Sequence, residues 1–290
     1  MNRRWAEAAL TFNTVLWGAT FVLIKAALQD VSALLFLALR FSLAAAALLV
    51  LFRGRLRKSP PAPAGAWLTG VFLFAGFFLQ TEGLRFTTAP KSAFLTGLTT
   101  VMVPLLTALV YKNRPQVSEV FGGLVATLGM GLMTLEGPVG SISRGDVLTL
   151  LGAIAFAGHI VTLGHFSTAV SFPVLSVVQV GGAAVCALVM APWAEPAHIA
   201  WQPAVVWAIL ITGLLCTALA FTVQAWAQRH TTSTRTALIY ALEPVVAWIT
   251  SFVVAGEGLA GRAAVGAALI LAGVMLVELK PLDSAVHPKE

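Results

Sequence analysis

Uncharged apolar segments long enough to cross a lipid bilayer recur along this chain. Between Val147 and Ala194, for example, it carries no Asp, Glu, Lys or Arg. Charged residues make up only 10% of the 290 residues, whereas a soluble domain carries roughly 25%. So little charge cannot cover a water-facing surface of ordinary size. The chain is therefore predicted to be an integral membrane protein, which excludes a soluble enzyme and a nucleic-acid-binding module.

The apolar segments divide the chain into ten predicted helices. A helix that crosses a bilayer needs about 20 residues, and the continuous runs do not alternate as the strands of a membrane β-barrel do. The predicted fold class is an all-α membrane protein with ten transmembrane helices. The predicted spans are 5–27, 31–52, 65–86, 91–111, 117–136, 146–166, 172–191, 204–228, 234–255 and 261–280. The first span shows no convincing cleavage site, so we interpret it as a retained helix.

The distribution of Lys and Arg predicts the orientation. With the N-terminus inside, 12 of the 18 Lys and Arg residues lie on the cytoplasmic side, 5 lie on the opposite side, and Arg40 lies within a span. The cytoplasmic set is Arg3, Arg4, Arg53, Arg55, Arg57, Lys58, Lys112, Arg114, Arg229, Arg235, Lys280 and Lys289, and the opposite set is Lys25, Arg85, Lys91, Arg144 and Arg262. Cytoplasmic loops carry an excess of Lys and Arg. Both termini are therefore predicted to be cytoplasmic, and the short loops suit a cell inner membrane.

The two halves of the chain, 1–140 and 141–290, resemble each other. A shift of 139 residues brings Trp17 onto Phe156, and a shift of 144 brings Phe77 onto Phe221 and Gln80 onto Gln224. The shift of 144 also brings Gly122 onto Gly266 and Gly129 onto Gly273. Because each half holds five predicted spans, an odd number, the halves would cross the membrane in opposite senses. Inverted repeats of this kind are typical of transporters whose substrate site lies near the midplane between the halves.

Several short motifs resemble those of the EamA-type family of the drug/metabolite transporter superfamily. They are Trp17-Gly18-Ala19-Thr20-Phe21, Leu39-Arg40-Phe41, Glu243-Pro244-Val245, Gly256-Glu257-Gly258-Leu259 and the stretch from Gly266 to Gly273-Val274. The resemblance covers nearly the whole chain. It implies ten helices in a 5+5 inverted repeat around a central cavity, and efflux of a small metabolite. One departure is Lys112-Asn113, where many relatives carry Gly-Glu, which weakens any role for a carboxylate there.

Arg40 and Glu243 place charge near mid-depth of their predicted spans. Each lies about 13 Å from one end of its span at about 1.5 Å of rise per residue, where an unpaired charge costs at least about 2.5–3.5 kcal/mol. Glu243 has three interpretations: a structural ion pair with Arg40, a site for a substrate amine or a proton, or a protonated carboxyl bonded to backbone near Pro244. Pro244 supplies no amide donor to the carbonyl of Tyr240, and such a break can line a cavity.

One polar and aromatic helix face occurs in both halves. In the second half it consists of Thr217, Phe221, Gln224 and Gln228, and its counterpart in the first half holds Phe77 and Gln80. A glutamine exposed to lipid would leave its hydrogen-bonding groups unmet. The face is therefore predicted to point toward protein or water, either as the lining of a pocket or as polar packing between helices.

Other candidate substrate contacts lie at similar depth. Trp17 is too deep for the interfacial belt where Trp usually lies, so it is either core packing or an aromatic wall that could attract a cation. His159 aligns with Thr20 in the other half and is either a hydrogen-bonded core residue or a proton or substrate contact. Tyr240 could donate a hydrogen bond into the cavity. Thr100 belongs to a run of small polar residues that permits close backbone approach or wets a pathway.

Transport is the function that these residues favour. The spacing of the Asp residues, and the absence of H-E-x-x-H and G-x-S-x-G patterns, give no support to a membrane-embedded enzyme, and no ring of like charge indicates a channel. Cys186 and Cys216 lie in apolar runs and indicate no metal site or disulfide framework. Without an ATP-binding loop, transport would depend on a gradient, such as proton antiport, on exchange or on facilitation. No cofactor is expected.

The predicted substrate is a small neutral or zwitterionic metabolite with an apolar part. We expect an amino acid, especially an aromatic or other hydrophobic one, whose amine meets Glu243 and whose apolar body meets Trp17, Phe77 or Phe221. The alternative substrate is an organic cation of the quaternary ammonium or guanidinium type, held by Glu243 and by cation–π attraction to Trp17. The expected partners are therefore a small solute, the lipid bilayer and protons as a candidate coupling ion.

Overall fold

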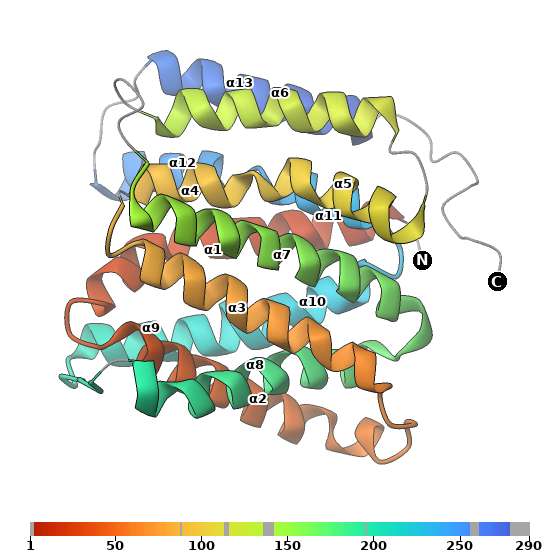
Figure 1. Cartoon of the computed structure of the whole chain (residues 1–290), viewed down its shortest axis with the longest axis vertical. Coiled ribbons are helices and arrows are strands. Elements are labelled where there is room, and N and C mark those ends of the chain that lie inside the picture. The colour runs from red at the N-terminus through yellow and green to blue at the C-terminus, as the bar shows by residue number, and fades with distance from the viewer. Residues whose placement is uncertain are drawn as a thin grey trace.

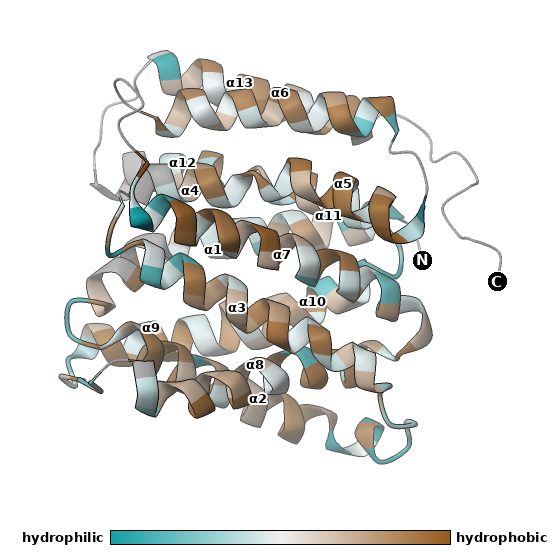
Figure 2. Ribbon diagram, in the orientation of Figure 1, coloured by the Kyte–Doolittle hydropathy of each residue, from teal (hydrophilic) through white to brown (hydrophobic). Residues whose placement is uncertain are grey.

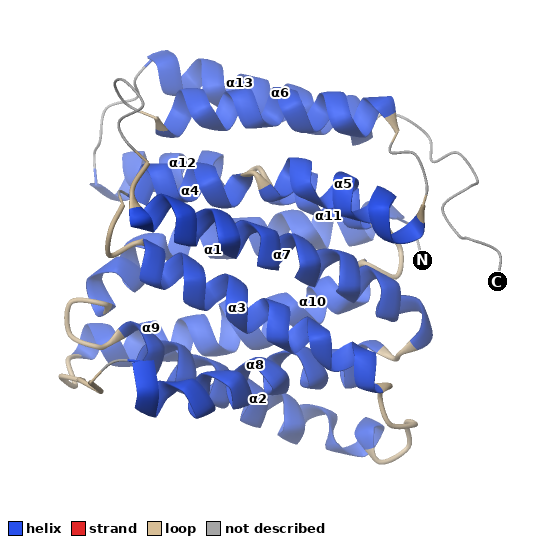
Figure 3. Cartoon of the chain, in the orientation of Figure 1, coloured by secondary structure: helices blue, strands red, loops and turns tan. Residues whose placement is uncertain are grey.

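Helices form almost all of the described structure (Figure 3). The computed structural model of the chain describes residues 3–87, 89–112, 116–135, 142–194, 196–255 and 261–278. Asn113 and the Gly256-Glu257-Gly258-Leu259 motif lie outside these ranges. An isolated antiparallel bridge joins Val31 to Ile199 and ties two loops together. The all-α prediction is confirmed.

The described residues of the first half form six α-helices. They are α1 (Arg3–Ala27), α2 (Ala33–Leu56), α3 (Leu68–Gly83), α4 (Ala89–Gly97), α5 (Thr99–Tyr111) and α6 (Val117–Thr134). A short 3₁₀ turn, Ala64–Trp67, precedes α3. The helix α2 continues four residues beyond the predicted 31–52, through Arg53 and Arg55. Long cationic side chains near a helix end can reach the polar interface while the backbone stays helical.

The second half repeats this order. Its helices are α7 (Arg144–Ala169), α8 (Phe172–Ala194), α9 (Pro203–Gly213), α10 (Ala220–Ala227), α11 (Ser233–Tyr240), α12 (Glu243–Ala255) and α13 (Gly261–Glu278). A π-helical segment, Leu214–Leu219, joins α9 to α10. The start of α7 carries a capping box, in which Ser143 Oγ accepts from the amide of Asp146 and the Asp146 carboxylate accepts from the amide of Ser143.

Corresponding helices of the two halves are interrupted at corresponding positions. In the first half α4 ends at Gly97 and α5 begins at Thr99; in the second, α11 ends at Tyr240 and α12 begins at Glu243. Thr99 and Glu243 are 144 positions apart, the same shift that aligns Phe77 with Phe221. Discontinuous helices of this kind line the substrate sites of many transporters.

The helices form one bundle in which they run roughly side by side (Figure 1). The N-terminal end of the bundle is where α1 begins, and the far end is where α2 begins. The α6–α13 pair occupies one edge and α2 with α8 the opposite edge, with α3 and α7 between them. The largest buried cluster joins α2, α3, α8 and the start of α10 around Phe41, Leu73, Val180 and Phe221.

Glycines set the close contact between α6 and α13. A Cβ on Gly129 would lie 2.5 Å from the carbonyl oxygen of Gly266, and one on Gly122 would lie 2.7 Å from that of Gly273. Residue numbers rise along one helix as they fall along the other, so the two helices are antiparallel. This pair of contacts maps onto itself under the 144-residue shift.

The surface of the bundle is apolar along its helices. Val50 is 72% exposed and Leu109 74% exposed, which suits contact with lipid rather than water. Hydrophilic residues gather toward the helix ends and loops (Figure 2). Among the described residues, seven helical segments are long and apolar enough to span a membrane. The three further predicted spans coincide with α1, with the interrupted α11–α12 and with the shorter apolar helix α13.

Candidate functional site

A row of aromatic rings crosses the centre of the bundle from one half of the chain to the other. The ring centroids of Trp17 and Phe221 are 5.5 Å apart, those of Phe221 and Phe77 are 6.2 Å apart, and those of Phe77 and Phe156 are 5.2 Å apart. Under the repeat, Trp17 corresponds to Phe156 and Phe221 to Phe77. The order of equivalent rings is therefore the same from either end of the row, and the row contains three of the predicted substrate contacts, Trp17, Phe77 and Phe221.

Trp17 is anchored to the π-helical segment of the other half. Its indole Nε1 donates to the carbonyl of Cys216 at 2.8 Å, and its ring lies edge-on to Tyr240 with centroids 4.8 Å apart. The Thr20 hydroxyl lies 3.4 Å from the Cys216 thiol. A π-helical turn displaces backbone carbonyls from the regular helical pattern, so the segment can accept a hydrogen bond from a neighbouring helix. Trp17, Thr20, Phe221 and Tyr240, four predicted site residues, are thus brought together.

Arg40 does not pair with Glu243 in this structure. It is 2% exposed, its Nε donates to Thr217 Oγ1 at 2.7 Å, and its guanidinium carbon lies 4.7 Å from the ring centroid of Phe77. Among the described residues, no carboxylate lies within 4 Å of the Arg40 guanidinium. The hydroxyl and the aromatic face take the place that the sequence interpretation gave to a carboxylate.

Glu243 is the first residue of α12 and is half-buried. A Cβ on Gly18 of α1 would lie 3.0 Å from the Glu243 carbonyl oxygen, so only a glycine lets α1 approach this break so closely. A helix N-terminus favours negative charge. Gly18 follows Trp17, whose indole bonds to Cys216, and Arg40 bonds to the neighbouring Thr217, so α1 and the π-helical segment link the break at Glu243 to Arg40.

Two predicted site residues bond near the interrupted α4–α5 helix. Gln80 Nε2 donates to Thr96 Oγ1 at 3.0 Å, which links α3 to α4. The Thr100 hydroxyl donates to the carbonyl of Ala237 at 3.4 Å, which links α5 to α11 across the two halves. These side chains connect the helices on either side of the breaks.

Gln224, the repeat counterpart of Gln80, lies in a fully buried network. Its Nε2 donates to Gln228 Oε1 at 3.2 Å, and Gln228 Nε2 donates to the carbonyl of Ile160 at 3.0 Å. The Gln224 Oε1 atom is buried and has no partner of good geometry, and the same holds for the Tyr240 hydroxyl. Buried polar atoms without partners are costly, so both mark places where a polar ligand group or a water could bind.

His159 is held by a residue that the sequence interpretation overlooked. Its Nε2 lies 2.8 Å from Gln179 Oε1, an atom that can only accept, and Gln179 Nε2 donates to the carbonyl of Phe221 at 3.0 Å. Gln179 corresponds to Arg40 at a shift of 139. The repeat alignment could have pointed to it. Asn13, whose Nδ2 donates to the carbonyl of Ala220 at 2.8 Å, was also missed and had no such signal.

Polar clusters related by the repeat lie at the two ends of the bundle. At the N-terminal end, the Glu7 carboxylate accepts from Thr231 Oγ1 at 3.3 Å and pairs with Arg235 Nη1 at 3.4 Å. At the far end, the Asp146 carboxylate accepts from Thr87 Oγ1 at 2.6 Å. Glu7 and Asp146 are 139 positions apart, and Thr87 and Thr231 are 144 apart. Each cluster joins the first half to the second.

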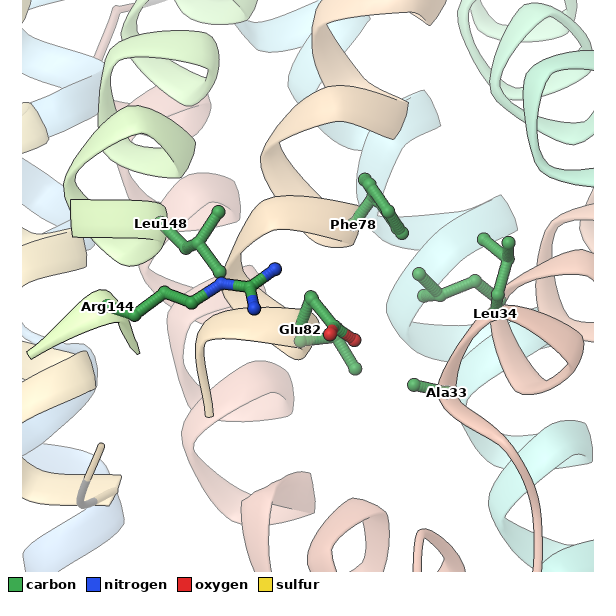
Figure 4. A pocket seen from close by; sticks show the side chains of 8 residues that line it. Ala33, Leu34, Phe78, Glu82, Arg144 and Leu148 are labelled. Atoms are coloured by element: carbon green, nitrogen blue, oxygen red, sulfur yellow. The ribbon is translucent and has the colours of Figure 1, made fainter. Parts of the chain in front are cut away.

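A pocket of about 260 Å³ lies at the far end between α2, α3 and α7 (Figure 4). Its walls are Ala33, Leu34, Leu37, Phe78, Thr81, Glu82, Arg144 and Leu148. None of the predicted substrate residues belongs to it. No sequence pattern predicted this pocket, because its lining comes from the ends of three helices.

Comparison with known proteins places nearly the whole chain in one family. The model of the EamA-like transporter family matches twice, at residues 4–135 and 143–279. The chain belongs to the EamA-like transporter family. An uncharacterized transporter of Archaeoglobus fulgidus is 31% identical over 97% of this chain and 88% of its own length. The uncharacterized transporter YyaM of Bacillus subtilis is 26% identical over 90% of each chain.

A solved crystal structure shares the fold. It covers 96% of this chain and 98% of its own, with a TM-score of 0.81 at 20% identity. This EamA-like transporter is a multi-pass membrane protein that moves a small-molecule substrate, and it is not an enzyme. The two family matches fall within the two halves that the sequence comparison separated.

Proposed function

We propose that this EamA-like transporter exports small zwitterionic metabolites, foremost aromatic and other hydrophobic amino acids, by alternating access. The observation that carries the substrate class is the presence of two opposite charges, Arg40 and Glu243, near the aromatic row without an ion pair between them. Arg40 bonds to Thr217 and lies over the ring of Phe77, whereas Glu243 lies where α1 approaches the break at Gly18, next to Trp17. A zwitterion could satisfy both charges at once, and its apolar side chain could pack on the rings.

The interrupted helices support a substrate site at this depth. Glu243 begins α12 directly after the break that follows Tyr240, and Pro244 cannot donate to the Tyr240 carbonyl. The Gln224 amide oxygen, which is buried without a partner, lies on the neighbouring helix α10, and the Tyr240 hydroxyl, which faces Asn13, lies on α11. A polar group that lacks a protein partner is available to a ligand. We assign substrate contacts to Trp17, Thr20, Phe77, Gln80, Thr100, His159, Phe221, Gln224, Tyr240 and Glu243, with Arg40 as the second charge.

The repeat supports a mechanism in which two five-helix halves rock against each other. We propose that residues 1–140 and 141–290 form these halves, with ten spans in all, inverted relative to each other in an inner membrane, and with both termini cytoplasmic. The polar clusters at Glu7 and Asp146 then act as reciprocal latches, one at each end. Opening either latch while the other stays closed would expose the centre to one side only.

Organic cations are the competing substrate class. A quaternary ammonium ion could stack on Trp17 and face Glu243, but Arg40, which bonds to Thr217 next to the Cys216 carbonyl that Trp17 binds, would repel it. This like-charge repulsion favours the zwitterion. Absence of a dedicated carboxylate partner for Arg40 among the described residues is consistent with a role in binding a substrate carboxylate.

Counterflow in proteoliposomes tests the substrate class. Vesicles that contain the purified protein are loaded with unlabelled phenylalanine, and the influx of labelled phenylalanine is followed; tetraethylammonium is tested in the same way. We expect phenylalanine counterflow and none of the cation. Counterflow of the cation alone would overturn the proposal in favour of cation efflux, and no counterflow of either would remove its support.

The Glu243→Gln variant tests the role assigned to the carboxylate. It should lower phenylalanine counterflow several-fold but leave part of it, because the carboxylate end of the substrate keeps its contacts. Asp30→Asn, in the loop between α1 and α2, removes a carboxylate away from the centre and should behave like wild type. Unchanged transport by Glu243→Gln would contradict the assignment.

A further inference from the structure

The pocket at the far end of the bundle carries two opposite charges on separate helices. Glu82 lies near the end of α3, and Arg144 is the first residue of α7. In Figure 4 the Arg144 side chain extends toward the region of Glu82, while Leu34 and Phe78 lie on the other side of the opening. The two charges face one pocket of about 260 Å³.

These two charges do not neutralise each other. The Glu82 carboxylate accepts from Arg85 Nη1, at 3.0 and 3.2 Å to its two oxygens. The guanidinium carbon of Arg144 lies 5.1 Å from the ring centroid of Phe86, and no carboxylate of the described residues lies within 4 Å of it. Arg144 therefore keeps its hydrogen-bond donors available to an anion from outside the protein.

Apart from Thr81, the rest of the lining is apolar, and several of its side chains are firmly packed. Leu34 and Leu37 of α2 are each 1% exposed. The ring of Phe78 is stacked on that of Phe74, with centroids 5.7 Å apart and planes 9° apart. A wall held by packed neighbours does not have to be ordered when a ligand binds, which lowers the entropic cost of binding.

We propose that this pocket is a second binding site for the zwitterionic amino acids of the proposed function, on which this inference rests. The ligand carboxylate pairs with Arg144, its ammonium group pairs with Glu82, and its apolar side chain packs on Leu34, Leu37 and Phe78. The size suits a small metabolite, since pockets for drug-sized ligands begin at about 300 Å³. With the proposed orientation the site lies on the non-cytoplasmic side, where an exported solute passes last.

A phospholipid headgroup such as phosphatidylethanolamine presents the same combination of amine, anion and apolar part. The free amino acid and the lipid are distinguished by the medium. Binding of the amino acid is measured in nanodiscs of phosphatidylcholine and in nanodiscs that contain phosphatidylethanolamine. Equal affinity in the two supports the amino acid as the occupant; loss of binding in the presence of phosphatidylethanolamine overturns it in favour of the lipid.

Ligands that lack one charge test each contact separately. Labelled phenylalanine is displaced by unlabelled phenylalanine, by its amide, which lacks the carboxylate, and by 3-phenylpropionate, which lacks the amine. All proteins carry the Glu243→Gln substitution, so that the centre contributes as little as possible. The parent protein should bind phenylalanine about tenfold to a hundredfold more tightly than either analogue, as expected for loss of one charge-assisted contact.

Each variant should lose one form of discrimination. Arg144→Gln should bind phenylalanine and its amide equally, and Glu82→Gln should bind phenylalanine and 3-phenylpropionate equally. Arg144→Lys keeps the charge but loses the planar guanidinium, and should retain part of the discrimination. Arg262→Gln, at an exposed position of α13, is the matched control and should behave like the parent. Discrimination that persists in both Gln variants would overturn the second site.

Failure of this inference is separable from failure of the proposed function. If wild-type phenylalanine counterflow is present but Arg144→Gln and Glu82→Gln leave both binding selectivity and counterflow unchanged, the pocket is not a substrate site and the transport proposal stands. If wild-type counterflow is absent, the transport proposal fails whatever the pocket binds. A melting-temperature measurement on every variant identifies those that are simply misfolded.

Discussion

Phe77 and Phe221 meet nearly at right angles in the centre of the bundle, with ring centroids 6.2 Å apart and planes at 84°. They occupy equivalent positions 144 residues apart, so each half of the chain contributes one phenylalanine to the contact. Phe221 also contacts Trp17 and His159. This contact makes the centre of the transporter a junction between the two halves, where a rocking motion would repack rings rather than break covalent or ionic links.

Replacement of Phe221 by Ala should destabilise the protein strongly. The residue is 3% exposed, and truncation of a buried Phe costs about 3–5 kcal/mol. Phe12, which is 52% exposed, provides the control, because Phe12→Ala removes a ring that packs on little protein. Melting temperatures in one detergent compare the two. Equal losses would show that the aromatic row does not organise the centre.

The hydrogen bond from Trp17 to the π-helical segment is open to a conservative test. Trp17→Phe keeps most of the ring but leaves the Cys216 carbonyl without its donor, which should cost about 1–3 kcal/mol and lower phenylalanine counterflow. Trp207→Phe, at an exposed position on α9, is the control. Stability and transport of Trp17→Phe that match those of the control would mean that the indole donor is dispensable.

The contact between α6 and α13 should not accept a methyl group. In Gly129→Ala the new Cβ would lie 2.5 Å from a backbone oxygen of α13, and the helices must separate, at a cost of about 1–3 kcal/mol. Gly54→Ala has nothing within 4 Å and should instead stabilise α2 by up to about 1 kcal/mol. Thermal unfolding should therefore shift in opposite directions, and a shared direction would contradict the close approach.

The end of α5 contains a non-glycine residue in the left-handed region. Lys112 has φ 54° and ψ 28°, a conformation that costs an L-residue about 1–2 kcal/mol. Lys112→Gly should raise the melting temperature, since glycine adopts this geometry without strain, and Lys112→Ala should not. The departure from the Gly-Glu of many relatives thus has a structural consequence. A lower melting temperature for Lys112→Gly than for Lys112→Ala would refute it.

The two polar latches should control accessibility in opposite ways. Reporter cysteines are placed by Ala227→Cys, buried at the N-terminal end, and Ser92→Cys, buried near the far end, with Cys186 and Cys216 replaced by Ala. The rate at which a thiol reagent labels each reporter cysteine is measured. Glu7→Gln should raise this rate at position 227 and lower it at position 92, and Asp146→Asn should do the reverse. A parallel rise at both reporters would indicate loosening rather than alternating access.

The sequence by itself determined the class and the local structure of this protein. Hydropathy and helical length are properties of short segments, so apolar stretches such as Val147–Ala194 were enough to predict a helical membrane protein. The family resemblance followed from short motifs such as the one around Trp17. The repeat also related Phe77 to Phe221 and Gln80 to Gln224 before any contact was known, because alignment needs only the order of residues.

Only the tertiary structure decided which side chains meet. Trp17 bonds to Cys216 across 199 positions and Arg40 to Thr217 across 177, and such partners depend on how helices cross rather than on spacing along one helix. The Arg40–Glu243 ion pair, one of the three interpretations of Glu243, is therefore replaced at Arg40 by a hydroxyl and an aromatic face. The π-helical segment and the pocket between Glu82 and Arg144 arise in the same way, from packing among helices that the sequence could place only one at a time.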